Sequence, residues 1–410
     1  MTETPAPERG PSIVLQDGTV TTPRGFRAAG IHCGIKPDRP DLALVAADAP
    51  AAAAGVFTTN RMRSAPVQLS EARLRAGRAQ AVVINSGNAN ACTGARGVAD
   101  AQAMAAAAAA ALGIPDELVL VASTGVIGRP LPIDTITAAM PRLVAALGSD
   151  GLAAARAIMT TDAFPKTAAA TVALGDGTAT VGGIAKGAGM IHPHMATMIA
   201  VLTTDAAVAP ALLRRALQDA ADRTFNCISV DGDTSTSDSV FLLASGAAGV
   251  RPIDAVDERY AAFVAGLTAV AGRLARLIVQ DGEGTTRVVE IRVRGARSDA
   301  DARRVGQTVM TSLLVKTAFH GAELNWGRLA AAVGRSGAEV DPDRLAIAIG
   351  DVWVAEGGVG VPERYDAAAP LLRASEVTVT LDLGLGGGTF VGWTSDLGET
   401  YVKINSGYLT

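Results

Sequence analysis

The stretch from Val181 to Asp205 reads VGGIAKGAGMIHPHMATMIAVLTTD, and its two halves differ in character. The first half is so rich in glycine that its backbone can take positive φ angles or approach another group closely, which a purely structural strand would avoid. The second half, TMIAVL from Thr197, is an apolar run suited to a buried strand. Thr197 therefore lies where a glycine-rich segment meets a rigid core element.

The composition around this stretch is that of a folded globular protein. The chain has 410 residues, of which 49% are hydrophobic and 19% charged, so it can bury a large core in one broad domain or two. The net charge of -4 provides no broad electropositive surface, so we expect no nucleic-acid partner. Three scattered cysteines, Cys33, Cys92 and Cys227, form no CxxC pair and favour a reducing compartment.

No targeting or membrane segment is evident. The first twelve residues, MTETPAPERGPS, are polar and lack the apolar region of a signal peptide, so they indicate a loose tail. The longest low-complexity apolar stretch, 103–112, is far shorter than the ~20 residues that span a bilayer. It ends at Gly113 and Pro115, which are typical of a helix stop. We therefore expect a cytoplasmic protein that does not cross a membrane.

Helical and strand patterns alternate along the chain and predict a mixed α/β fold with much antiparallel pairing. Apolar runs at 81–84 and 118–122 end in the polar clusters INSGNANACTG and ASTGVIG, which is typical of strands that deliver loops to a site. Amphipathic patterns predict helices at 210–223 and 256–279. The last third predicts strands at 288–295, 345–354, 376–384 and 401–405, with a helix near 302–319.

A threonine at the head of a strand is by default an inert capping or pairing residue. Its chemistry changes if the bond from Ala196 to Thr197 is cut, because Thr197 then carries a free α-amine beside its own hydroxyl. An α-amine has a pKa of ~7.7 to 8.0 that desolvation lowers further, so a neutral amine can accept the hydroxyl proton near neutral pH. The pair would form a nucleophile with its own base.

The run KGAGMIHPHMATMIA resembles the cleavage site of the ornithine acetyltransferase (glutamate N-acetyltransferase) family, whose precursors cut themselves before the Thr of an Ala-Thr-Met triplet. The resemblance spans nearly the whole chain. Further motifs that carry it are GVFTTNRMRSAPV (55–67), INSGNANACTG (84–94), ASTGVIG (122–128), MTTD (159–162), VDGDTSTSD (230–238), SLLVKTA (312–318), NWGR (325–328) and YVKINSGY (401–408). The chain departs from the family at His194, where Asn is common, in the glycine-rich loop 383–390, and at 397–402, which lacks the usual Tyr-Asp pair.

This resemblance implies an αββα layered fold similar to N-terminal nucleophile hydrolases, with a smaller mixed α/β C-terminal part. Self-cleavage would separate an α chain, 1–196, from a β chain, 197–410, and two of each would form a heterotetramer. Thr197 is implied as the nucleophile, with Thr124 and Gly125 as the oxyanion hole, because a hydroxyl and a backbone N–H at a glycine turn can both point at a developing alkoxide.

The resemblance also implies a set of substrate-binding residues. These are Thr160, Lys186, Thr197, Glu283, Asn405 and Thr410. Lys186 can meet a carboxylate and Glu283 an ammonium group, which suits an acylated amino acid. Because Asn405 and Thr410 lie near the C-terminus, the resemblance implies that this end of the chain is docked.

The implied reaction moves an acetyl group from N2-acetyl-L-ornithine to L-glutamate in arginine biosynthesis, through an acetyl-threonine and a ping-pong course, with no cofactor and no metal. The sequence leaves open whether acetyl-CoA is a second donor. Two alternatives also stay open: a hydrolase or aminopeptidase of the same fold that releases the acyl group to water, and an acetyltransferase of specialised metabolism.

Other kinds of site fit less well. His192 and His194 could bind a metal together with Asp231 or Asp233, but Pro193 between the histidines is better explained as a conformational lock. DGDTSTSD resembles a calcium loop, yet Thr and Leu stand where that loop needs Gly and Glu. GLGGGT lacks the third glycine and the following helix of a dinucleotide site. A non-catalytic binding protein would leave the glycine-rich approach to Ala-Thr-Met unexplained.

Overall fold

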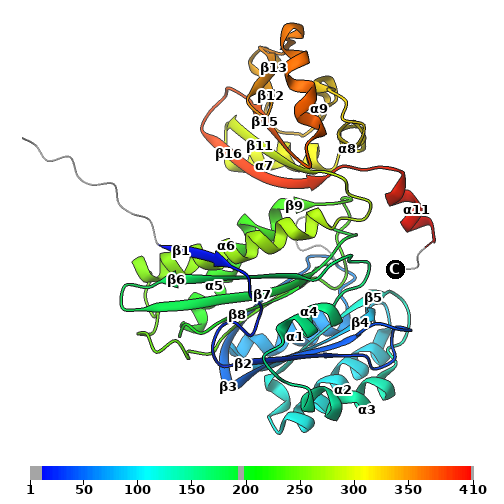
Figure 1. The fold of residues 1–410 in the computed structure, drawn as a ribbon, viewed down its shortest axis with the longest axis vertical. Helices are drawn as coiled ribbons and strands as arrows, with labels where there is room; N and C mark the ends of the chain where they lie inside the picture. Colours follow the sequence, from blue (N-terminus) through cyan, green and yellow to red (C-terminus); the bar gives the residue numbers. More distant parts are fainter. Residues whose placement is uncertain (1–11, 193–197, 408–410) are drawn as a thin grey trace, which may run out of the picture.

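The computed structural model describes residues 12–192 and 198–407, and Figure 1 shows a layered body with a smaller C-terminal part above it. The first eleven residues, for which a loose tail was predicted, lie outside this range. The described strands of the body form a nine-stranded sheet in the order β1-β6-β7-β8-β10-β3-β4-β5, with β2 paired to β3. Their bounds are β1 Ile13–Gln16, β2 Phe26–Ile31, β3 Leu42–Phe57, β4 Arg78–Asn88, β5 Val119–Val126, β6 Lys166–Ala173, β7 Thr178–Lys186, β8 Ile199–Thr204 and β10 Ser239–Ala244.

Strand β3 belongs to both halves of this sheet. Its first half pairs with β2 and β4, its second half pairs with β10, and the register against β4 shifts between Ala46 and Ala51. Val45 of β3 packs in one buried cluster with Val201 of β8 and Phe241 of β10. The two halves of the sheet therefore face each other across a shared core.

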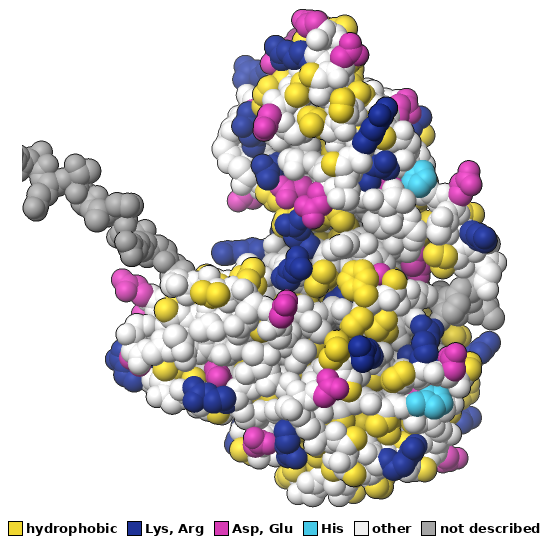
Figure 2. Space-filling view, viewed as in Figure 1, with side chains coloured by type: hydrophobic (Ala, Val, Ile, Leu, Met, Phe, Trp, Pro, Cys, Tyr) yellow, Lys and Arg dark blue, Asp and Glu magenta, His cyan; other side chains and the backbone are white. Residues whose placement is uncertain are grey.

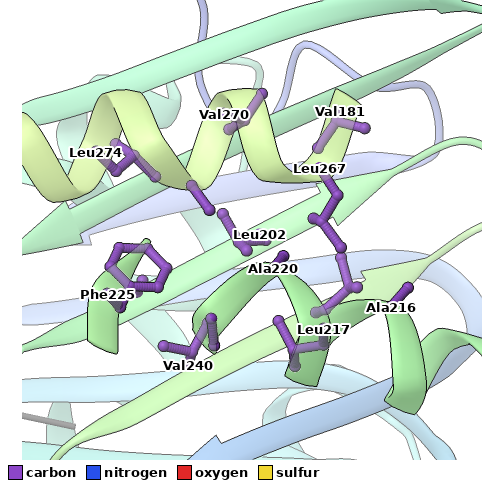
Figure 3. Close-up of a cluster of buried hydrophobic side chains, with 14 of the residues drawn as sticks. Val181, Leu202, Ala216, Leu217, Ala220, Phe225, Val240, Leu267, Val270 and Leu274 are labelled. Atoms are coloured by element: carbon purple, nitrogen blue, oxygen red, sulfur yellow. The ribbon is translucent and has the colours of Figure 1, made fainter. Parts of the chain in front are cut away.

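Helices cover the two outer faces. On one side α5 (Pro210–Arg223) and α6 (Glu258–Gln280) pack on the half formed by β6, β7, β8 and β10, and Figure 3 shows Leu217 and Leu274 of these helices close to Leu202 and Val240 of the strands. On the other side α1 (Ala65–Arg73), α2 (Gly94–Leu112) and α3 (Ile133–Ala145) cover β2 to β5. The predicted αββα layering is confirmed.

Two more helices complete the body. Helix α4 (Gly151–Ala157) packs beside β2 and leads into the loop that carries Thr160. In the described part of the chain, α6 has the length and hydropathy of a membrane-crossing helix. Its apolar residues Phe263, Leu267 and Leu274 are fully buried in the protein core, which accounts for that composition.

The C-terminal part is a second sheet, whose described strands run in the order β14-β13-β12-β15-β11-β16-β9. Their bounds are β9 Ile228–Ser229, β11 Val288–Ala296, β12 Ala346–Ile349, β13 Val352–Glu356, β14 Val359–Gly360, β15 Glu376–Asp382 and β16 Gly388–Ser395. The helices are α7 Asp299–Met310, α8 Leu313–His320, α9 Trp326–Gly334, α10 Tyr365–Ala368 and α11 Glu399–Gly407. Figure 1 shows α11 leaving this sheet toward the layered body. On the face in Figure 2, cationic and anionic side chains are interspersed over both parts.

Three predicted elements were wrong. The single strand predicted at 345–354 is a hairpin of β12 and β13, because Gly350, at φ +56°, forms a tight turn with Asp351. The helix predicted near 302–319 is two helices, since Ser312 adopts an extended conformation and begins α8. The strand predicted at 401–405 lies within α11, where the Asn405 side chain donates to the Tyr401 carbonyl one turn earlier.

Candidate active site

A polar cavity of about 120 Å³ lies where the ends of β5 and β7 meet the loops of the body and α11. It is lined by Ala89, Thr124, Gly125, Ile127, Thr160, Thr161, Lys186, Gly189, Met190, Asp231, Asp233, Ser235, Thr236, Ser237, Glu283, Tyr401 and Asn405. Six residues that the sequence proposed for the site are thus brought together from distant segments. Ala196, Thr197, Thr410 and His194 lie outside the described residues.

Gly125 shows why the end of β5 needs glycine. Its φ is +130°, and a Cβ built there would lie 2.3 Å from the Gly87 carbonyl carbon and 2.5 Å from the Asn88 nitrogen on β4. The preceding Thr124 is 1% exposed, and its hydroxyl accepts a hydrogen bond from Lys186 Nζ at 3.4 Å. A hydroxyl and the peptide of a glycine that no larger residue could replace therefore line the same cavity, an arrangement suited to an oxyanion.

The glycine-rich segment approaches another group closely, as the sequence predicted. A Cβ on Gly189 would lie 2.6 Å from Cδ of Glu283, so any larger residue would displace that carboxylate. The next residue, Met190, takes a φ of +56°, which is unusual for a residue with a side chain. Asp231 supports this backbone by accepting the N–H groups of Met190 at 2.6 Å and Ile191 at 2.8 Å.

Lys186 lies beside a buried ionic network. Burial lowers the pKa of Lys186, while Asp162 and Glu283 act in the opposite direction. Lys166 Nζ donates to Asp162 Oδ1 at 2.7 Å and to Asp281 Oδ2 at 2.5 Å. Burial alone would raise the pKa of Asp162, but Lys186 and Lys166 hold it at about 2. Asp162 is therefore ionised and offsets the charge of the cavity lysine.

Carboxylates dominate another side of the cavity. Asn405 Nδ2 donates to Glu283 Oε2 at 2.7 Å, and the Tyr401 hydroxyl donates to Asp231 Oδ2 at 3.2 Å. Burial and the neighbouring Asp231 raise the pKa of Tyr401, so this hydroxyl keeps its proton. Asp233 also lines this side. Because Lys186 lines the same cavity, the lining offers both a cation and anions, which suits a molecule that carries an ammonium group and a carboxylate.

The hypothesis of a metal site is not supported by the described residues. They contain no group of three or more His, Cys, Asp or Glu side chains placed to hold a metal. Asp231 is instead engaged with backbone N–H groups, and His192 Nδ1 lies 3.3 Å from Ser229 Oγ. His194 lies outside the described residues.

Sequence reasoning missed several residues of this site. Asp162 and Tyr401 lie within recognised motifs, MTTD and YVKINSGY, but neither was assigned a role, and Asp231 was considered only as a possible metal ligand. Tyr401 and Asp231 line the cavity, and Asp162 pairs with Lys166 beside it. Tyr401 and Asn405 are four residues apart, which is the spacing of neighbours on a helix. Because a strand was predicted at 401–405, this helical spacing was not recognised.

An αββα sandwich whose strand ends line a small cavity with buried cations and anions is typical of an enzyme site. The sequence matches the ArgJ family over residues 27–410. The chain belongs to the ArgJ family and is an acyltransferase of arginine biosynthesis.

Among its relatives is the arginine biosynthesis bifunctional protein ArgJ of Symbiobacterium thermophilum, 51% identical over 96% of this chain and 99% of its own. The protein of the same name from Geobacter sulfurreducens is 51% identical over 94% and 99%. The solved argJ of Bacillus halodurans is 39% identical and covers 46% of this chain and 99% of its own, with a TM-score of 0.42. The ornithine acetyltransferase of Mycobacterium tuberculosis, solved with ornithine, is 46% identical over 44% and 98%, with a TM-score of 0.42.

Proposed function

We propose that the chain transfers the acetyl group of N2-acetyl-L-ornithine to L-glutamate, after cutting itself between Ala196 and Thr197 into an α chain, 1–196, and a β chain, 197–410. The observation that carries the proposal is the convergence of Thr124, Lys186 and Glu283 on one cavity in a member of the ArgJ family. An oxyanion site, a cation and an anion are the groups that this transfer needs.

In the proposed mechanism Thr197 Oγ1 attacks the acetyl carbonyl and the α-amine of Thr197 takes the hydroxyl proton. The Thr124 hydroxyl and the Gly125 N–H stabilise the tetrahedral oxyanion. The bond between the carbonyl carbon and the ornithine nitrogen then breaks, and that nitrogen leaves with the proton held by the amine. The amine of L-glutamate attacks the resulting ester, N-acetyl-L-glutamate departs, and the hydroxyl of Thr197 is restored.

Substrate orientation in this proposal follows the charges of the cavity. Lys186 binds a substrate carboxylate and Glu283 an ammonium group, with Thr160, Asn405 and Thr410 completing the site. The buried ionised Asp162 supports this assignment, because it offsets the cost of a charged Lys186 away from water. No cofactor or metal takes part.

The first experiment is intact-mass measurement of the purified protein with an assay of acetyl transfer. Cleavage after residue 196 of 410 divides 41.5 kDa into fragments of roughly 20 and 22 kDa by proportion. Thr197→Ala should leave one uncut chain without transferase activity, whereas Thr197→Ser keeps a hydroxyl and should retain measurable cleavage. An uncut and fully active Thr197→Ala protein would refute the mechanism.

The same assay separates the second candidate, a hydrolase of this fold. If water rather than L-glutamate receives the acetyl group, free acetate becomes the main product even with glutamate present. Acetyl-CoA as a second donor, which the word bifunctional in the relatives' names suggests, predicts release of a free thiol that depends on glutamate.

The proposal also includes assembly and location. A heterotetramer of two α and two β chains predicts a mass near 83 kDa, twice the 41.5 kDa of one chain, in light scattering. We place the enzyme in the cytoplasm, where its three free cysteines would stay reduced.

A further inference from the structure

Asp238, which immediately precedes β10, binds the residue that follows the proposed nucleophile. Its side chain is fully buried, and Oδ1 accepts the N–H of Met198 at 3.0 Å. The N–H of Ser239 donates to the Met198 carbonyl at 3.2 Å. Met198 leads into β8, which runs parallel to β10 with Ile199 opposite Ser239. Both polar groups of the Met198 backbone are thus held by two consecutive residues of the neighbouring segment.

The described groups that act on Asp238 include hydroxyl-bearing side chains and one lysine. Its backbone carbonyl accepts the N–H of Thr58 at 3.2 Å, and the Thr58 hydroxyl donates to the Ser235 carbonyl at 2.7 Å. Among the described residues, Oδ2 of Asp238 has no hydrogen-bond partner and no cation forms an ion pair with the carboxyl. Lys186 is the charged side chain that acts on it from β7.

The pKa of the Asp238 carboxyl is therefore shifted in the direction that favours its protonated form. Burial raises its pKa well above the ordinary range, and the Met198 N–H and Lys186 oppose that shift only in part. A protonated carboxyl has one carbonyl oxygen that accepts and one O–H that donates. A carboxamide of the same size also offers one acceptor and donor hydrogens, so asparagine can replace such a group with little change in hydrogen bonding.

We propose that Asp238 is a positioning residue for Thr197, because its Oδ1 acceptor fixes the peptide unit between residues 197 and 198 and so the direction of the nucleophile. The inference rests on the proposed function. A regular strand would hold this N–H with a backbone carbonyl, whereas here a buried side chain takes that place at the junction with the cleavage site. A misplacement of about 1 Å at a reacting group can cost about 100-fold in rate.

The test compares Asp238→Asn with Asp238→Ala and Asp238→Ser in the full chain. Asparagine keeps an acceptor for Met198, so the extent of self-cleavage and kcat should stay within about threefold of the wild type. Alanine and serine cannot reach that N–H, and they should lower the cleavage rate or kcat by about 30-fold or more, with KM within about threefold.

Ser239→Ala is the matched control. It removes an equally buried side chain that donates to the Ser237 carbonyl at 3.2 Å, but it leaves the backbone bond to Met198 intact. We expect its cleavage and kcat to match the wild type even if its melting temperature falls as far as that of Asp238→Ala.

Three results would overturn the inference: wild-type cleavage and kcat in Asp238→Ala, an Asp238→Asn protein as impaired as Asp238→Ala, or a Ser239→Ala protein that loses kcat along with melting temperature. The second result would point to the acidic proton rather than the acceptor, and the third to general stability. A wild-type protein that stays uncut would instead refute the proposed function, whatever the Asp238 variants do.

Discussion

The Asn405 amide donates a hydrogen bond to Glu283 Oε2 at 2.7 Å, and this contact ties helix α11 to the cavity. The described residues of α11 include none that is buried, so apolar packing adds little to its attachment. Among the described residues, a second side-chain bond from α11 to the body joins Tyr401 to Asp231, which is again a cavity carboxylate. The position of α11 therefore depends on two carboxylates that line the cavity, and one of them, Glu283, is the group that we expect to bind the substrate ammonium.

We predict that Asn405→Ala raises KM for N2-acetyl-L-ornithine about 10-fold, because a hydrogen bond to a charged group contributes about 1.5 to 3 kcal/mol. The melting temperature should hardly change, since α11 lies on the surface. Steady-state kinetics and thermal unfolding measure the two effects. Ser406→Ala, on an exposed position of the same helix, is the control and should leave KM unchanged. An unaltered KM in Asn405→Ala would show that α11 does not help to form the site.

Thr124 provides a prediction on the chemical step. Thr124→Val keeps the shape of this buried side chain but removes its hydroxyl, so kcat should fall by about 100- to 1000-fold, as for other oxyanion donors. Thr124→Ser keeps the hydroxyl and should retain most of kcat. Both proteins are to be checked by intact mass, so that slow cleavage is distinguished from slow transfer. A Thr124→Val enzyme that is cut and turns over normally would exclude Thr124 from the oxyanion hole.

Much of the fold was predictable because its signals are local. Pro210 at the first helical position and the apolar period after it define α5 from its first to its last residue, and Gly113 ends α2 in the left-handed conformation expected of a glycine stop. The prediction of a strand at 401–405 was wrong for the opposite reason, because the state of this segment depends on distant contacts. It is short, mostly exposed and without a clear period, so its helical state depends on contacts with Glu283 and Asp231 that lie far away in the sequence.

The residues of the candidate site also differ in whether the sequence alone could identify them. Thr124, Lys186 and Glu283 could be named because they stand in recognisable motifs, and they do line one cavity. Lys166 could not be named, because nothing in its neighbourhood in the sequence indicates that a lysine between Pro165 and Thr167 is fully buried. Its role depends on Asp281, more than a hundred residues later, and only the folded structure brings the two together.

This buried network predicts a large effect on stability. Lys166→Met leaves Asp162 and Asp281 facing each other without their shared cation, which should cost about 3 to 5 kcal/mol in the free energy of unfolding. Urea unfolding measures the change. Combining it with Asp281→Asn should recover part of the loss, because Asp281 then carries no charge and Asp162 still faces the buried Lys186. Arg276→Met, which breaks an exposed pair with Glu376, should change stability by less than about 1 kcal/mol. Equal effects of the two single substitutions would contradict this account.

Lys316 on α8 leads to a prediction on pH. Its side chain is 1% exposed, and Nζ donates to Thr394 Oγ1 at 2.9 Å and to Ser395 Oγ at 3.2 Å. Burial lowers the pKa of Lys316 from 10.5 to about 7, and Asp396 and Asp231 oppose this shift only in part. Between these two pH values the unfolded chain keeps the proton of Lys316 and the folded protein has released it. The free energy of unfolding should therefore rise with pH across this window, by up to about 1.4 kcal/mol per pH unit from this group.

Lys316→Met should remove that slope. We would measure the free energies of unfolding of the wild type and the variant in urea at pH 7, 8 and 9. As the pH rises, the free energy of unfolding of the wild type should increase relative to that of the variant. Other groups that titrate in this range act in both proteins and cancel in the difference. Lys403→Met removes an exposed lysine of α11 and serves as the control. Its free energy of unfolding should change with pH in parallel with that of the wild type. Parallel curves for Lys316→Met as well would mean that Lys316 stays charged in the folded protein, with its hydrogen bonds to Thr394 and Ser395 sufficient to hold an ammonium group away from water.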